Sequence, residues 1–84
     1  MQVTVLGGPL DGQRRKAPRS KFRNEEHAFV AGLCRGKVAL YLWKPIPGPL
    51  WQKWTWQYAE TINTDIVHEV LAYLDKHYPS VSIN

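Results

Sequence analysis

The chain has 84 residues, of which 44% are hydrophobic and 21% charged, and its formal net charge is +4. A chain of this length buries one core but not two, so we predict a single domain over residues 1–84. No apolar run approaches the roughly 20 residues that cross a bilayer, and Met1 leads directly into an alternating pattern, so we expect a cytoplasmic protein without membrane contact. Cys34 is the only cysteine, which excludes an intramolecular disulfide and a zinc site built from several cysteines.

The first 17 residues have the pattern of a β-hairpin. Residues 2–6 alternate polar and apolar side chains, as a half-buried strand does. Residues 7–12 (GGPLDG) combine three glycines, a proline and an Asp-Gly pair, all of which favour a chain reversal. Residues 13–17 can return as a short second strand, so we expect an N-terminal hairpin over 1–17.

Gly7 and Gly12 also have the spacing of the first glycines in a phosphate-binding loop. A lysine and a serine or threonine follow in that loop, whereas Gln13 and Arg14 occupy those places here. Pro9 also removes one of the amides that would surround a phosphate. The segment is therefore interpreted as a turn and not as a nucleotide site.

The stretch from Val3 to Gly12 (VTVLGGPLDG), followed by Pro18, resembles the start of many small phage and prophage proteins. Those proteins begin with a strand and a Gly-Gly-Pro-x-Asp-Gly turn. The resemblance covers about a fifth of the chain and carries no catalytic residue. It implies a phage-type accessory protein in the cytoplasm of the host cell, which binds a host or phage protein and modulates a host defence.

Positive charge is concentrated in residues 14–23. This segment holds six of the eleven Lys and Arg residues, which leaves five basic against seven acidic residues in the rest of the chain. The six are Arg14, Arg15, Lys16, Arg19, Lys21 and Arg23. We expect a basic loop over 18–26. It is either a solvated connection or part of a nucleic-acid site, in which cations contact phosphates and rings such as Phe22 stack on bases.

Residues 27–44 predict a central hairpin with residues 35–36 (Arg-Gly) as a two-residue turn. This turn sets a register that places Phe29 opposite Leu42. Both faces of the hairpin are then apolar, and one helix covers only one of them. The other face needs a cover, which is the N-terminal hairpin, the tail 80–84 or a second copy of the chain in a homodimer.

A stiff, proline-rich connection over 45–50 leads into another predicted strand, from 51 to 60. Trp54, Trp56 and Tyr58 share one side of that strand. These rings either fill the core or form a stacking platform beside the basic loop.

The last third of the chain predicts a helix over 63–78. Asn63 or Thr64 can cap its start, and Pro79 marks its end. Its apolar residues lie on one stripe, which suits packing on a sheet. With antiparallel strands over 27–61, the predicted fold class is α+β, an antiparallel sheet of four to five strands with one C-terminal helix packed on one face.

Groups suited to catalysis are few and scattered. His27 and Cys34 lie at opposite ends of one predicted strand, about 23 Å apart at roughly 3.3 Å per residue, beyond the reach of a base and its nucleophile. Asp65, His68 and Glu69 share an exposed helix face, where polar groups are more often solvated than bound to metal. We expect no enzyme activity, no cofactor and no metal site.

The leading hypothesis is non-enzymatic protein binding by a rigid proline loop between two indoles. Its contact candidates are Trp43, Ile46, Pro47, Leu50 and Trp51. The alternative is nucleic-acid binding by the 14–23 cations and the sheet aromatics. No RNA-recognition, helix-turn-helix or zinc-finger motif accompanies those cations.

Overall fold

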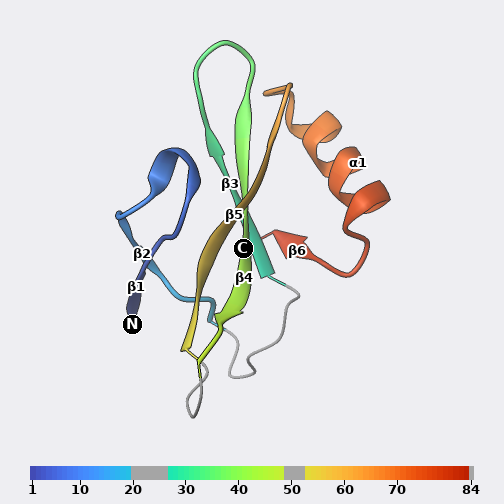
Figure 1. The fold of residues 1–84 in the computed structure, drawn as a ribbon. Helices are drawn as coiled ribbons and strands as arrows, with labels where there is room; N and C mark the ends of the chain where they lie inside the picture. Colours follow the sequence, from blue (N-terminus) through green and yellow to red (C-terminus); the bar gives the residue numbers. More distant parts are fainter. Residues whose placement is uncertain (20–26, 49–52, 84) are drawn as a thin grey trace.

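A computed structural model of the protein describes residues 1–19, 27–48 and 53–83. It has two sheets and one C-terminal helix, and the predicted α+β class is confirmed (Figure 1). The four-stranded sheet has the order β5-β4-β3-β6, and the two-stranded sheet pairs β1 with β2. The elements are β1 Gln2–Thr4, the 3-10 turn η1 Gly8–Leu10, β2 Arg14–Lys16, β3 His27–Gly32, β4 Val38–Ile46, β5 Lys53–Ile62, α1 Val67–His77 and β6 Ser82–Ile83.

The four-stranded sheet lies between two covering layers. In Figure 1 the β1–β2 hairpin stands on one side of the sheet and α1 on the other. The second apolar face of the central strands, for which the sequence offered three possible covers, is therefore covered by the N-terminal hairpin. The need for a covering second copy, which motivated the homodimer, disappears with it.

The expectation of a purely antiparallel sheet is wrong at one edge. The tail after α1 forms β6, which pairs parallel to β3 through His27 with Ser82 and Ala28 with Ile83. The tail thus extends the sheet and does not cover its second face. The sequence gives little warning of this strand, because two residues cannot establish an alternating pattern.

The predicted register of the central hairpin is also wrong, by one residue. Phe29 lies opposite Tyr41 and not opposite Leu42. The turn is a three-residue loop over 34–36, closed by a hydrogen bond of 2.8 Å from the Leu33 amide to the Lys37 carbonyl. A shift of one residue moves every side chain to a different set of cross-strand neighbours. Both faces are apolar in either register, so the hydrophobic pattern could not decide between them.

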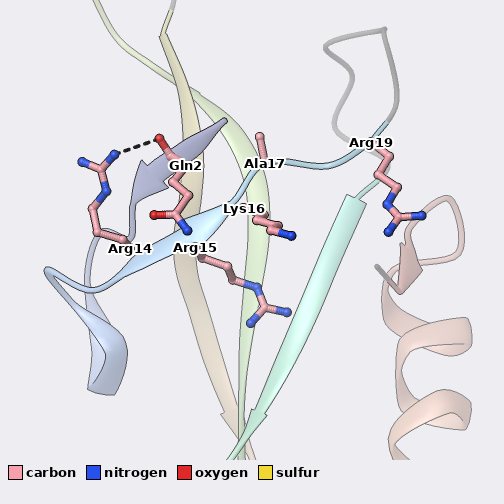
Figure 2. Close-up of a pocket in the computed structure, with 6 residues that line it drawn as sticks. All are labelled: Gln2, Arg14, Arg15, Lys16, Ala17 and Arg19. Carbon is pink, nitrogen blue, oxygen red and sulfur yellow. Dashed lines mark hydrogen bonds between the residues drawn. The ribbon is translucent and has the colours of Figure 1, made fainter.

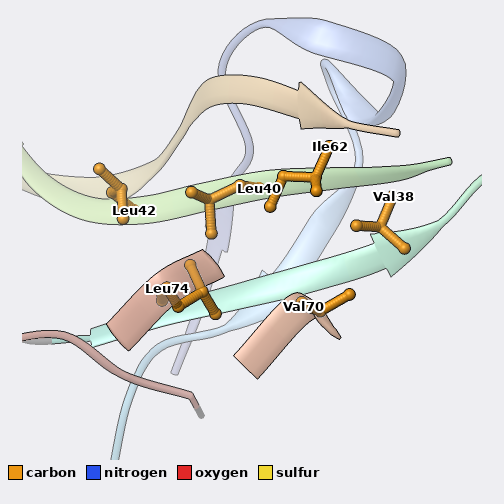
Figure 3. Close-up of a cluster of buried hydrophobic side chains, with 7 residues drawn as sticks. Val38, Leu40, Leu42, Ile62, Val70 and Leu74 are labelled. Carbon is orange, nitrogen blue, oxygen red and sulfur yellow. The ribbon is translucent and has the colours of Figure 1, made fainter. Parts of the chain in front are cut away.

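The sheet has a separate core on each face. Against α1 lies an aliphatic cluster, shown in Figure 3, of Ala28, Val38, Leu40, Leu42, Ile62, Val70 and Leu74. Against the hairpin lies an aromatic cluster of Val5, Phe29, Ala39, Tyr41, Trp43 and Trp56. The alternation of side chains along β4 explains the division, since odd-numbered residues face the hairpin and even-numbered ones face the helix.

A bulge in β5 changes which residues face the helix. The pairing with β4 shifts between Tyr41, which lies opposite Tyr58, and Leu40, which lies opposite Glu60. The extra residue lets Glu60 and Ile62 join the helix side of the sheet. The described part of this strand, Lys53–Ile62, ends two residues later than the predicted 51–60, and residues 51–52 lie outside the described ranges.

The helix is shorter than predicted and begins at Val67. Thr64 holds the preceding turn, because its hydroxyl accepts a hydrogen bond of 3.2 Å from the Ile66 amide and donates one of 3.1 Å to Glu69. Of the predicted apolar stripe, Val70 and Leu74 are buried, and they anchor α1 to the sheet.

Candidate nucleic-acid interface

The glycine turn between β1 and β2 is fixed by tyrosine side chains of the main sheet. The Tyr41 hydroxyl donates a hydrogen bond of 2.9 Å to the Gly7 carbonyl and accepts one of 2.9 Å from the Leu10 amide. Gly8 has a φ of +65°, and a Cβ there would lie 2.5 Å from Cδ1 of Tyr58. The Gly-Gly-Pro sequence is thus explained by a close approach between the turn and the sheet.

The turn has little backbone left with which to bind a phosphate. The Gly7 amide donates to the Asp11 carboxylate at 2.6 Å, and the Gly12 amide donates to the Val5 carbonyl at 2.9 Å. The Gln13 amide donates to the Leu10 carbonyl at 3.0 Å. These donors are used inside the protein, which supports the interpretation of the segment as a turn.

The cations that follow the turn gather around a shallow hollow of about 580 Å³ (Figure 2). Of the described residues that line it, four are basic and none carries a carboxylate. The lining residues are Gln2, Arg14, Arg15, Lys16, Ala17 and Arg19, which we call the basic hollow. The exposed side chains of β2 supply most of the charge of the basic hollow. A ligand that enters it therefore meets a positive electrostatic field from these residues.

The pairing of β1 with β2 determines to which face of the hairpin each basic side chain points. Arg15 lies opposite Val3, on the hairpin face that packs on the sheet, whereas Arg14 and Lys16 lie on the alternate face. The Arg15 guanidinium carbon sits 3.7 Å from the centroid of the Phe29 ring. This cation–π contact orients the guanidinium without neutralising its charge.

The strand that carries the cations is tied to the sheet beneath it. The Trp56 indole donates a hydrogen bond of 3.0 Å to the Lys16 carbonyl. The chain after β1 runs along the edge of β5, where the Leu6 amide donates to the Trp56 carbonyl at 3.0 Å and the Tyr58 amide donates to the Leu6 carbonyl at 2.9 Å. These bonds hold β2 in place before any ligand binds, so binding costs little ordering of the backbone.

A second polar cluster lies on the other face of the sheet, around Glu60. Its carboxylate accepts a hydrogen bond of 2.6 Å from Tyr73 and another from Tyr78. The hydrogen bonds from Tyr73 and then Tyr78 lower the pKa of Glu60. The bond to Glu60 raises the pKa of Tyr78 to about 12 and raises that of Tyr73 as well. This cluster joins α1 to β5, and sequence reasoning missed it because the β5 bulge creates it.

The structure brings together four of the six predicted anion-binding residues, Arg14, Arg15, Lys16 and Arg19. Lys21 and Arg23 lie outside the described residues. Phe22 and most of the predicted basic loop over 18–26 lie outside them as well.

The protein-contact candidates are placed less favourably. Trp43 is only 4% exposed and packs edge-on against Trp56, with ring centroids 5.1 Å apart. Ile46 is half-buried at the end of β4, and Pro47 is exposed after it. Leu50 and Trp51 lie outside the described residues.

The three aromatic residues of β5 have different environments. Trp56 is fully buried in the aromatic cluster. Trp54 is half-buried against the same cluster, and Tyr58 is 37% exposed beside the glycine turn. Core filling therefore accounts for Trp56, while Trp54 keeps part of its ring at the surface.

Within the described residues, no three His, Cys, Asp or Glu side chains gather as metal ligands. In the same ranges, no helix is long and apolar enough to cross a membrane. Comparison of the chain with protein-family models, with curated proteins and with solved structures found no match. Any functional conclusion must therefore come from the residues themselves.

Proposed function

We propose that this protein is a non-enzymatic binder of nucleic acid, and that the basic hollow contacts the phosphate backbone. The observation that carries the proposal is the gathering of four cations around one hollow, with no carboxylate among the described residues that line it. Surface cations of this kind attract phosphates and release the counterions condensed on them, which favours binding.

The geometry of β2 suits this role in a second way. Arg14, Arg15 and Lys16 are all exposed, so a phosphate reaches their side chains without any rearrangement of the fold. Arg15 is also oriented by the Phe29 ring, and a planar guanidinium donates two parallel hydrogen bonds to a phosphate.

Binding of a host or phage protein by the proline loop is less well supported by the same geometry. Of its five candidate residues, Trp43 is in the core, and only Ile46 and Pro47 reach the surface among the described residues. A buried indole offers little area to a partner. The phage-type accessory role therefore stays a prediction from the resemblance of the first residues.

The test is a titration of fluorescent oligonucleotides, single-stranded and duplex, over a range of salt concentrations. With three or four phosphate contacts, the logarithm of affinity should fall with the logarithm of salt concentration with a slope of about −2 to −4. The double variant Arg14→Gln/Lys16→Gln should make that slope about 1 to 2 units shallower, because two contacts are lost.

A matched control removes the same charge elsewhere. Lys37 lies beside the loop of the central hairpin and Lys76 lies near the end of α1, and both are exposed. Lys37→Gln/Lys76→Gln should leave the slope almost unchanged. If both double variants make the salt slope equally shallow, binding depends on net charge alone and not on the basic hollow. Binding without any salt dependence would refute the proposal.

A further inference from the structure

A second hollow lies next to the basic one, at the end of the hairpin where the chain begins. Its volume is about 200 Å³. Of the described residues that line it, four are apolar and one is a lysine. They are Met1, Val3, Trp43, Lys53 and Trp54, and we call this site the Trp54 hollow.

The Trp54 ring is held in a fixed orientation. It stacks on Trp43 with centroids 6.3 Å apart and planes inclined by 26°. Trp43 in turn packs edge-on against the fully buried Trp56. A ring supported in this way loses little side-chain entropy when a flat ligand stacks on its exposed part.

The two hollows share strand β1 as a wall. Gln2 lines the basic hollow, while its neighbours Met1 and Val3 line the Trp54 hollow. Gln2 lies opposite Lys16, and the Ala17 amide donates a hydrogen bond of 2.9 Å to the Met1 carbonyl. The cations of β2 lead toward Met1, and because Gln2 and Val3 point to opposite faces of the hairpin, a ligand that follows them passes around the chain end at Met1 to reach the Trp54 hollow. Lys53 offers a further positive charge there.

We propose that the Trp54 hollow accepts an unpaired base of a single-stranded nucleic acid whose phosphates lie along the basic hollow. The inference rests on the proposed function and specifies its substrate class. Stacking between a base and an aromatic side chain requires a free base face, which a base-paired duplex does not present. The hollow is also smaller than the ~300 to 1,000 Å³ of sites that enclose larger ligands, which suits one flat ring system.

The experiment compares two anionic probes, oligo-dT and an inorganic polyphosphate, which carries charge but no bases. Trp54→Leu should weaken oligo-dT binding by about 5- to 100-fold, since one stacked base is lost. Its binding of polyphosphate should not change, because no cation has been removed. Trp54→Phe keeps a ring and should retain most of the oligo-dT affinity. Circular dichroism and a thermal melt check that each variant is folded.

A second measurement uses the unaltered protein, so that it does not depend on the stability of a variant. Oligonucleotides that carry bromodeoxyuridine are cross-linked by ultraviolet light, and the modified residues are mapped by mass spectrometry. Cross-links at Trp54 or its neighbours Met1 and Lys53 support the inference. Cross-links confined to residues 14–19 overturn it.

The outcomes separate the two proposals. If neither probe binds, the proposed function itself fails. If both bind and Trp54→Leu changes neither affinity, the protein contacts only the backbone, and the stacking site is refuted while the proposed function stands. Equal weakening of both probes by Trp54→Leu also refutes the stacking site, because the change then acts through the basic hollow.

Discussion

At the scale of single residues, Gly8 is the most constrained of the described glycines. Its positive φ would strain any other residue, and a Cβ there would also meet the Tyr41 hydroxyl at 2.6 Å. Gly12 has a φ of +83° but open space around the same position. A comparison of substitutions at Gly8 and Gly12 therefore separates backbone strain, which both positions share, from overpacking, which affects only Gly8.

We expect Gly8→Ala to destabilise the protein by about 2 kcal/mol more than Gly12→Ala, because the inserted methyl displaces a packed tyrosine. Urea unfolding followed by far-ultraviolet circular dichroism measures both variants. Equal losses of unfolding free energy would show that the turn moves aside at no cost and that its contact with Tyr41 and Tyr58 is loose.

Sequence reasoning identified the residues of the turn and most of the cations, but not what they touch. The glycines, Pro9 and Asp11 act locally, so their turn could be predicted from neighbouring residues alone. Tyr41 contacts that turn from 34 residues away, and nothing in its own surroundings in the sequence indicates the contact. The exposed part of Trp54 was likewise beyond prediction, since alternation places a side chain on a face without giving its depth.

At the scale of elements, the contact between β5 and α1 depends on the ionisation of Glu60. The folded-state pKa of Glu60 is lowered by Tyr73 and Tyr78. Its contribution to stability is therefore present above the unfolded pKa of about 4.3 and is lost as pH falls through the lower folded-state value. Tyr78 acts in the opposite direction. Its pKa is raised to about 12, so its contribution is present below about pH 10 and is lost as pH rises toward 12.

Glu60→Gln should flatten this dependence on pH. The melting temperature of the unaltered protein should fall more steeply than that of the variant between pH 5 and 3, and again between pH 10 and 12. Asp75 is an exposed carboxylate on α1, the helix that carries Tyr73. Asp75→Asn is therefore the control and should follow the unaltered protein. Parallel profiles for Glu60→Gln and the unaltered protein would mean that the two tyrosine contacts add nothing to stability.

A comparison of the predicted and observed elements shows which parts of the fold can be predicted from short-range sequence patterns. The Arg-Gly pair between two apolar runs predicted the β3–β4 hairpin, and the long, periodic apolar stripe over 63–78 predicted α1. The register between β3 and β4 depends on one loop residue, and Arg35 adopts an unusual φ of +62° there. The β5 bulge adds one residue without any Gly or Pro to mark it, so no local signal indicated that Glu60 faces the helix.

At the scale of the whole molecule, charge is divided between the two layers that cover the sheet. The hairpin layer carries the cations of the basic hollow, while in the other layer Asp65, Glu69 and Asp75, on or beside α1, outnumber Lys76, the lysine of that helix. The net charge of +4 understates this separation. A polyanion that approaches the protein is attracted to the hairpin side and repelled from the helix side, which orients the encounter before contact.

The hairpin layer is joined to the sheet by partners that are distant in the chain. Tyr41, Trp56 and Thr55 bond to Gly7, Lys16 and Thr4, across 34, 40 and 51 residues respectively. The central strands, by contrast, pair with their neighbours in sequence. Closing the longer loops costs more entropy, so we expect the hairpin to join last in folding and to open first.

Amide hydrogen exchange of the native protein tests this order. The amides of Val5 and Ala17 should exchange at least tenfold faster than those of Leu40 and Leu42 in the centre of β4. Uniform protection across all four would show that the hairpin opens only with the whole molecule.

The same connections affect the timing of synthesis on the ribosome. Residues 1–17 leave the exit tunnel before the strands on which they pack, and the Trp56 that fixes β2 follows 40 residues after Lys16. During that interval Arg14 and Arg15 are already part of the nascent chain, but the Trp56 side chain that fixes β2 has not yet been added. The N-terminal hairpin is thus made before the sheet that supports it, and a chain interrupted before β5 carries the charge of the binding surface without its shape.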